Sequence, residues 1–307
     1  KALEVVTKGL RSSVTEALAL ERQAINELAA TPAARNLIRV FFLQERARKQ
    51  VYAEGLTGLP PVERAAVVGA GVMGAGITQW LTSRGLPVTL TDIGPDQLAK
   101  GMATIDKLYR EGIKRRIFTR TSAQRGMDRV SPVTGAAQLH RVELVIEAAV
   151  ETLDIKKKIF HDLDQRTPPD AILATNTSAL PISEIAAATS RPDKVIGIHF
   201  FNPVHRMQLV EIVVGEQTSP ETVQRTLSFV QGIGKLPVIS KDRPGFIVNR
   251  ILLPYLIEAG RLFDNGANIE TVDRAMLDFG MPMGPLRLID EVGADVALHV
   301  AATLHAS

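Results

Sequence analysis

The segment Gly69-Ala70-Gly71-Val72-Met73-Gly74 fits the pattern G-x-G-x-x-G and decides the expected fold. It directly follows an apolar run at residues 65–68, and a helical pattern that ends near Gly85 follows it. In such a strand–turn–helix unit, the glycines allow a tight turn, close approach of the backbone to a pyrophosphate, and close packing of helix on strand. The N–H groups at the helix start then face the phosphates. The segment predicts a dinucleotide site, although glycine-rich turns alone occur in many folds.

Short apolar runs alternate with helical patterns along the middle of the chain. They lie at residues 65–68, 88–91, 144–146, 171–174 and 195–198, and runs at 209–214 and 237–239 extend the series. Strands alternating with helices are typical of βαβ units on a parallel sheet. From Pro244 onward the strand pattern stops, and residues 246–263 and 270–279 have helical periodicity. The sequence predicts an α/β fold with a Rossmann-type doubly wound sheet, followed by an all-helical domain.

The first 62 residues are expected to form a helical segment. Apolar residues recur three or four positions apart from Leu3 to Leu18, which predicts one amphipathic helix over residues 2–30. Thr31 and Pro32 suit the cap and first turn of a second helix. Residues 55–61, rich in glycine and proline, are typical of a linker. We therefore predict three segments, at residues 1–62, 63–243 and 244–307.

Composition excludes several classes of function. The 36 basic and 33 acidic residues give a net charge of only +3, so we expect no nucleic-acid partner. Cysteine is absent, which excludes disulfides and thiolate chemistry, and we expect no bound metal. No apolar run approaches the roughly 18 residues of a membrane span. The chain begins at Lys1 without a signal-peptide pattern, so we expect a fragment or processed piece.

Asp92 ends the second predicted strand, where an acidic side chain binds the ribose hydroxyls of a dinucleotide. Its carboxylate would repel a 2′-phosphate, and Ile93 rather than an arginine follows it. These residues predict NAD rather than NADP as the cofactor. The alternative is that Asp92 is only a turn residue before Gly94 and Pro95.

His199 and Glu211 are the candidate catalytic pair. His199 lies at the carboxyl end of a predicted strand, where open α/β sheets bind ligands. Glu211 interrupts the apolar run 209–214, where a carboxylate is costly to bury without a partner. If the chain reverses around residues 202–204, the two side chains meet. Such a pair suits alcohol oxidation, because imidazole takes the hydroxyl proton and the carboxylate orients it. A structural histidine remains an equal alternative on these residues alone, and His205 receives no role.

From about Glu63 onward, the chain resembles the 3-hydroxyacyl-CoA dehydrogenases in several separate segments. These are residues 69–74 with Asp92, 146–151 with Lys156, 175–180, 196–214, 242–250 and 283–290. The resemblance implies NAD-dependent oxidation of a (S)-3-hydroxyacyl-CoA substrate to 3-oxoacyl-CoA in fatty-acid β-oxidation. Two alternatives stay open: a 3-hydroxyisobutyrate-type dehydrogenase, which shares the glycine turn but relies on a catalytic lysine, and a fragment that is inactive or only binds NADH.

The resemblance also implies residue roles. His199 is the expected catalytic base with Glu211 as its partner, and Ser178 and Asn249 match polar groups around the substrate 3-oxygen. The expected cofactor-binding residues are Gly69, Gly71, Met73, Gly74, Asp92, Ala149, Val150, Glu151, Lys156, Ser178 and Asn202. Without the resemblance, Ser178 is equally a helix cap, Asn249 an ordinary helix residue, and Lys156 a solvated lysine.

A basic cluster falls in a region that lies near coenzyme A in the family. Its members are Lys114, Arg115, Arg116, Arg120 and Arg125. Cationic side chains pair with phosphates. A merely solvated basic helix face is the favoured interpretation, because charge runs are common on exposed helices.

The segment 1–62 resembles the last helices of the hydratase/isomerase part of multifunctional β-oxidation proteins of the alpha-subunit type, together with the linker helix that follows, and residues 31–45 carry the match. The hydratase active-site residues are not in this chain, so no hydratase activity is expected. The stretch from Arg243 to His305-Ala306-Ser307 is shorter than the family's helical domain, which predicts a truncated C-terminal domain. The resemblance implies a thiolase subunit as partner of the full-length form. It favours the bacterial cytoplasm, with peroxisome and mitochondrial matrix as alternatives.

Overall fold

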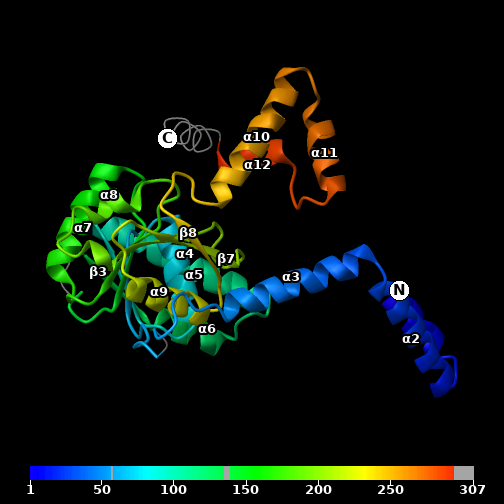
Figure 1. Cartoon of the computed structure of the whole chain (residues 1–307). Coiled ribbons are helices and arrows are strands. Elements are labelled where there is room, and N and C mark those ends of the chain that lie inside the picture. Colours follow the sequence, from blue (N-terminus) through cyan, green and yellow to red (C-terminus); the bar gives the residue numbers. More distant parts are fainter. Residues whose placement is uncertain (57, 135–138, 294–307) are drawn as a thin grey trace. The chain divides into compact units, whose positions relative to one another are not determined.

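The computed structural model describes residues 1–56, 58–134 and 139–293 of the chain (Figure 1). It forms two compact units, Lys1–Gln50 and Val51–Ser307. The first unit contains helices only, and the second contains the sheet and the C-terminal helices. Within the described ranges, no helix combines the length and the apolar character that crossing a membrane requires.

The first unit consists of α1 (Ala2–Gly9), α2 (Val14–Ala29) and α3 (Pro32–Arg48). The prediction of one helix over residues 2–30 was wrong. α1 ends at Gly9, and α2 begins with a capping box. In this capping box, the Ser13 hydroxyl accepts from the Glu16 N–H and the Glu16 carboxylate accepts from the Ser13 N–H. This arrangement satisfies N–H groups that a helix start leaves free. The predicted start of α3 is confirmed, with Thr31 as its cap.

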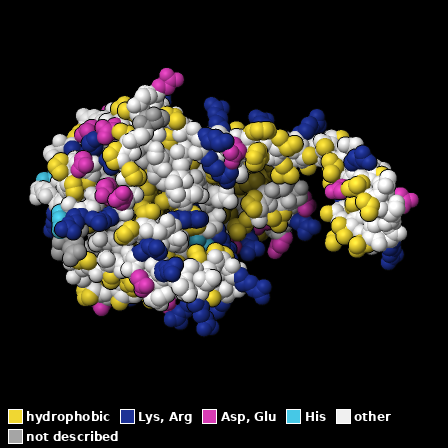
Figure 2. Space-filling view, turned by 90° about the horizontal axis from the view of Figure 1, so that it is seen from below, with side chains coloured by type: hydrophobic (Ala, Val, Ile, Leu, Met, Phe, Trp, Pro, Cys, Tyr) yellow, Lys and Arg dark blue, Asp and Glu magenta, His cyan; other side chains and the backbone are white. Residues whose placement is uncertain are grey.

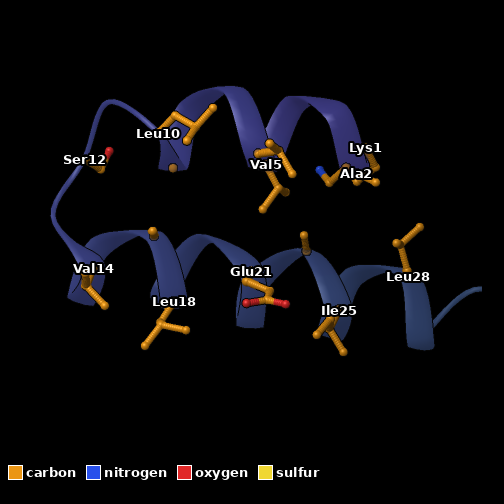
Figure 3. Close-up of a pocket in the computed structure, with 14 residues that line it drawn as sticks. Lys1, Ala2, Val5, Leu10, Ser12, Val14, Leu18, Glu21, Ile25 and Leu28 are labelled. Atoms are coloured by element: carbon orange, nitrogen blue, oxygen red, sulfur yellow. The ribbon is translucent and has the colours of Figure 1, made fainter.

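Hydrophobic side chains lie at the surface of this helical unit (Figure 2). The two most exposed are Leu3 and Leu10 of the α1 region. A pocket between α1 and α2 has a mostly apolar lining, in which Val5 is directed toward α2 and Glu21 is one of few charged residues (Figure 3). This lining holds no set of polar groups suited to a reaction. The predicted catalytic and cofactor-binding residues all lie in the second unit.

The second unit is built on an eight-stranded sheet in the order β3-β2-β1-β4-β5-β6-β7-β8. The strands are β1 (Ala65–Val68), β2 (Val88–Asp92), β3 (Val130–Thr134), β4 (Leu144–Glu147), β5 (Ile172–Thr175), β6 (Val195–Phe200), β7 (Leu209–Val214) and β8 (Leu236–Lys241). All the predicted strands are present. Neighbouring strands pair in parallel, except that β7 runs antiparallel to β6. The predicted chain reversal is thus confirmed, because the loop 201–208 is too short for a parallel crossover.

β3 was not predicted from the apolar runs of the sequence. This strand pairs only with β2, at the edge of the sheet, and it carries Pro132 and the exposed Ser131. Proline cannot donate to a strand ladder and is confined to such edges. The segment therefore lacks the apolar run by which the buried strands were recognised.

Helices cover both faces of the sheet (Figure 1). They are α4 (Val72–Ser83), α5 (Pro95–Lys114), α6 (Arg120–Met127), α7 (Leu153–Arg166), α8 (Ile182–Ala186) and α9 (Pro220–Gly232), with a short 3₁₀ turn at Pro192–Lys194. Alternate strand residues enter two separate cores: Leu144 and Ile146 belong to one, and Val145 to the other. Because both faces are buried, these strands are apolar throughout. The predicted doubly wound α/β fold is confirmed.

Three helices follow the sheet: α10 (Val248–Asp264), α11 (Ile269–Phe279) and α12 (Pro285–Val292). The predicted helices at 246–263 and 270–279 are present, and α12 was not predicted. α11 ends at Gly280, whose φ of 115° is a conformation that glycine adopts readily. The residues 305–307, on which we based the expectation of truncation, lie outside the described residues.

Candidate active site

The glycine turn lies after β1, beside the point where the strand order reverses direction between β1 and β4. Open α/β sheets bind ligands at such a switch point, outside the carboxyl ends of their strands. Gly69 has a φ of 103°, and a Cβ there would lie 2.6 Å from the Ala148 carbonyl oxygen. A Cβ on Gly74 would lie 1.7 Å from the Gly69 carbonyl oxygen. Both positions therefore need glycine for the turn to form.

Gly71 differs from the other two glycines, because a Cβ there would meet nothing within 4 Å. It is the N-cap of α4, and no side chain caps this helix. The first N–H groups of a helix lack partners within the helix and attract anions. The start of α4 is therefore open to a negatively charged ligand.

Asp92 is the last residue of β2, as predicted, and its carboxylate faces the glycine turn. One oxygen accepts from the Ala70 N–H at 2.6 Å, and the other accepts from the Ile93 N–H at 2.7 Å. A carboxylate oxygen has further acceptor capacity after one such bond. Asp92 thus fixes the turn and retains the ability to accept from a ribose hydroxyl.

His199 and Glu211 are directly opposite residues of β6 and β7. The His199 Nδ1 lies 2.7 Å from the Glu211 Oε2, so the predicted contact is confirmed. Both side chains are buried, Glu211 completely. An ionised carboxylate only accepts hydrogen bonds, so Nδ1 carries the proton and Nε2 of the neutral ring is left as an acceptor. This is the form of histidine that takes up a proton from a hydroxyl group.

The second oxygen of Glu211 is also engaged. Its Oε1 accepts from the N–H groups of Ile247 and Val248, each at 2.9 Å, at the start of α10. The ring of Phe246 lies 5.8 Å from the His199 ring, and that of Phe201 lies 4.4 Å from it, measured between centroids. Glu211 therefore holds the imidazole and the first turn of α10 at the same time, and two aromatic rings limit movement of the histidine.

Ser178 and Asn249 meet beside this pair. The Asn249 side-chain amide donates to the Ser178 carbonyl oxygen at 3.0 Å. The Ser178 N–H donates to the Glu151 Oε1 at 2.8 Å, and the Thr177 hydroxyl donates to the same oxygen. The loops after β4 and β5 and the first turn of α10 are thus joined through three side chains and the two backbone groups of Ser178.

Lys156 is not a solvated lysine, and that interpretation was wrong. It is fully buried on α7, and its ammonium donates to both oxygens of Glu147, at 2.8 and 2.9 Å. The Glu151 carboxylate lies 3.4 Å away. Burial of the lysine is tolerated because an opposite charge pairs with it at close range.

Glu147 was missed as a site residue. Its carboxylate, buried at the end of β4, also accepts from the Ala149 N–H and the Thr175 hydroxyl, each at 2.7 Å. An acidic residue within an apolar strand was the available signal, as it was for Glu211. Because Ala149 lies in the loop that continues to Glu151, Glu147 fixes the path of that loop.

The remaining predicted residues follow the carboxyl ends of β1, β4 and β6. Met73 is half-buried in the first turn of α4, while Val150 and Asn202 are exposed in loops after β4 and β6. All five residues of the basic cluster are exposed, as a solvated face requires. Within the described part of the chain, no group of three or more His, Asp or Glu side chains is placed to hold a metal ion.

The chain matches known families over nearly all of its length. Residues 64–243 match the family described as 3-hydroxyacyl-CoA dehydrogenase, NAD binding domain, and residues 245–307 match the corresponding C-terminal domain. A fatty acid oxidation complex subunit alpha from Acinetobacter baylyi is 38% identical over 98% of this chain. The chain spans 42% of the length of that relative.

Solved structures with related sequences have the same fold. A (S)-3-hydroxybutyryl-CoA dehydrogenase from Ralstonia eutropha is 39% identical with a TM-score of 0.77, covering 80% of this chain and 87% of its own. A 3-hydroxybutyryl-CoA dehydrogenase from Escherichia coli is 40% identical with a TM-score of 0.77, covering 80% of this chain and 52% of its own. The likeness therefore extends to both sequence and architecture.

Proposed function

Since this chain belongs to the 3-hydroxyacyl-CoA dehydrogenase family, we propose that it oxidises the 3-hydroxyl group of a (S)-3-hydroxyacyl-CoA to a ketone with NAD as cofactor. The observation that carries the proposal is the 2.7 Å contact between His199, near the carboxyl end of β6, and Glu211 on β7. In the reaction, the substrate and NAD⁺ give 3-oxoacyl-CoA, NADH and one proton.

The residues after β1 and β2 fit a dinucleotide. α4 has no side-chain cap, and the space in front of Gly71 is open to a pyrophosphate. Asp92 ends β2 with acceptor capacity for the ribose. Bound NAD would supply the hydride acceptor for carbon 3 of the substrate. Met73, Ala149, Val150, Glu151 and Asn202, around the same edge, complete the cofactor-binding set that we propose.

His199 is the proposed general base. Its Nε2 takes the proton of the 3-hydroxyl group while carbon 3 loses its hydride. Glu211 keeps the proton of the neutral ring on Nδ1, and its negative charge stabilises the imidazolium that forms. Since the Glu211 Oε1 is fixed by two backbone N–H groups, the carboxylate and the ring stay oriented during the transfer.

Ser178 and Asn249 are proposed to hold the substrate 3-oxygen next to His199. They come from different parts of the unit, and the Asn249 contact with the Ser178 carbonyl sets their distance. Lys156 has its ammonium engaged by Glu147 and Glu151. We propose that it contributes to cofactor binding chiefly by holding Glu151 in place.

An assay of acetoacetyl-CoA-dependent NADH oxidation tests the proposed function. We expect turnover with acetoacetyl-CoA and none with free acetoacetate at the same concentration. Turnover of free hydroxy acids alone would instead favour a 3-hydroxyisobutyrate-type dehydrogenase. NADH binding without turnover of any substrate would identify the chain as a fragment that only binds the cofactor.

The glycine turn gives a paired prediction. Gly71→Ala is expected to raise the Kd for NADH about tenfold, equivalent to about 1.4 kcal/mol, with no change in thermal midpoint. The added methyl group has space in the protein but obstructs the pyrophosphate. Gly74→Ala is expected to cost about 1–3 kcal/mol of stability, because its Cβ would collide with the Gly69 carbonyl oxygen. NADH titration and thermal unfolding of both variants separate these effects, and equal behaviour of the two would contradict the assignment.

The longer protein is proposed to work in a complex. The relatives that match this chain carry the name of a complex subunit, and the chain spans only part of their length. We propose a thiolase subunit as partner, the bacterial cytoplasm as location, and the three predicted segments as the domain division. Co-purification of a thiolase activity with the full-length protein tests the partner.

A further inference from the structure

Lys235 is a buried cation that has no role in the reaction described above. It lies directly before β8 with a relative exposure of 2%, and among the described residues no carboxylate pairs with it. Its ammonium donates to the carbonyl oxygens of Val204 and Met207, the latter at 2.7 Å. It also lies 3.7 Å from the centre of the Trp80 ring, as in cation–π interactions.

The surroundings of Lys235 disfavour its charge. Burial, and secondly the Arg84 guanidinium on the same Trp80 ring, lower the pKa of Lys235 from 10.5 to about 8. Around the adjacent loop stand Arg206, Arg115 and Glu111, and His205, whose own pKa is lowered chiefly by burial. The Lys235 amine is still protonated at neutral pH, which lies below its pKa of about 8.

The charge costs stability. A folded-state pKa below the unfolded value means that the unfolded chain binds the proton more tightly. The contribution of Lys235 to stability therefore rises as the pH increases from about 8 toward 10.5. The ammonium nevertheless donates to two carbonyl oxygens, which no apolar side chain could do.

The two carbonyl groups that Lys235 binds belong to the loop 201–208, which joins His199 on β6 to Glu211 on β7. This loop carries Asn202, a proposed contact of the cofactor. The side chain of Val204 lies against Gly76 of α4, where a Cβ would be 3.1 Å away. The Leu236 N–H, next to Lys235, donates to the Gln208 carbonyl oxygen at 2.8 Å. The loop 201–208 is therefore held by several contacts, and Lys235 supplies two of these hydrogen bonds.

We propose that Lys235 is a positioning residue for the dehydrogenase reaction: its ammonium fixes the loop 201–208 so that Asn202 faces the cofactor. This inference rests on the proposed function for its kinetic consequence. Trp80 seals the other side of the ammonium, and the Trp80 indole N–H donates to the Ile233 carbonyl oxygen at 3.1 Å. The Trp80 ring is thus held against Lys235 by the segment that precedes β8, to which both Ile233 and Lys235 belong.

Lys235→Met tests the proposal, because it keeps an apolar side chain of similar length and removes the ammonium. We expect kcat/KM for NADH to fall by about 10²-fold, the size of effect that a misplacement of about 1 Å produces. Lys235→Arg, which restores two donors, is expected to recover part of the loss. Lys241→Met, which replaces the exposed lysine at the end of β8, is the matched control and is expected to match the wild type.

The single tryptophan of the chain gives a readout that is independent of activity. Because the Lys235 ammonium touches the Trp80 ring, loss of its proton is expected to change the tryptophan emission. We expect a transition with a midpoint near pH 8 in the wild type and in Lys241→Met, and none in Lys235→Met.

These measurements separate the two proposals. If the wild type has no dehydrogenase activity but shows the emission transition and a weaker NADH Kd in Lys235→Met, the proposed reaction fails and the positioning role stands. If Lys235→Met loses thermal stability but keeps the NADH Kd and kcat/KM of the wild type while folded, Lys235 is merely structural. An emission transition that persists in Lys235→Met, together with an unchanged kcat/KM for NADH, would overturn the positioning role.

Discussion

Replacing His199 with alanine is expected to lower the rate of acetoacetyl-CoA reduction by about 10²–10⁴-fold, the factor that proton transfer by a positioned side chain typically contributes. The Kd for NADH is expected to stay nearly unchanged, because the glycine turn follows β1 and Asp92 ends β2, whereas His199 lies on β6. Steady-state rates and an NADH titration on the same preparations measure the two quantities.

The control for His199→Ala is His161→Ala, which removes an exposed histidine of α7. This variant is expected to behave as the wild type in both measurements. Equal losses of NADH affinity and of rate in His199→Ala would show that the imidazole supports the fold of the cleft and does not transfer the proton.

Glu211→Gln is expected to cause the second large loss, of about 10²-fold or more in rate, with little loss of stability. Glutamine keeps an oxygen for the N–H groups of Ile247 and Val248 but presents an NH₂ group to His199. The ring then has to accept on Nδ1 and carry its proton on Nε2, which removes the base. A comparable carboxylate-to-amide change in a Ser-His-Asp triad costs about 10⁴-fold.

Glu211→Ala separates the two tasks of the carboxylate. It leaves the first N–H groups of α10 without their acceptor, so we expect a lower thermal midpoint as well as a lower rate. Rates and unfolding curves of the two variants are compared directly. Wild-type activity in Glu211→Gln would show that the negative charge next to His199 is not needed.

Much of the fold was predictable, because the doubly wound sheet buries both faces of its strands. Continuous apolar runs therefore marked β1, β4 and β5, and the glycine turn marked the start of α4. The spacing of Ser13 and Glu16 also indicated a helix start between α1 and α2. The apolar periodicity continues across this point, and we gave it more weight when we predicted one helix. The edge strand β3 lacked an apolar run altogether.

The site was predictable where a residue conflicted with its local pattern. Glu211 stood out as a carboxylate in an apolar strand, and its register opposite His199 follows from the short reversal between β6 and β7. Glu147 carried the same signal, but its partner Lys156 looked like an ordinary member of a lysine run. The contact depends on which face of α7 meets the sheet, and this is set by packing.

Contacts between segments that are distant in the sequence could not be predicted from it. The N–H groups that bind Glu211 are backbone groups of Ile247 and Val248, which no side-chain pattern reveals. The contacts of Lys235 with Trp80 and with Val204 likewise join segments that are far apart along the chain. Such contacts require the three-dimensional path of the loops.

The most direct test of the central claim is a crystal structure of the protein with NAD⁺ and acetoacetyl-CoA bound, a pair between which no hydride can pass. We expect the His199 Nε2 to lie within hydrogen-bond reach of the substrate 3-oxygen, at about 2.6–3.2 Å or through one water molecule, while Nδ1 keeps its contact with Glu211. An imidazole turned away from the 3-oxygen, with no water between them, would contradict it.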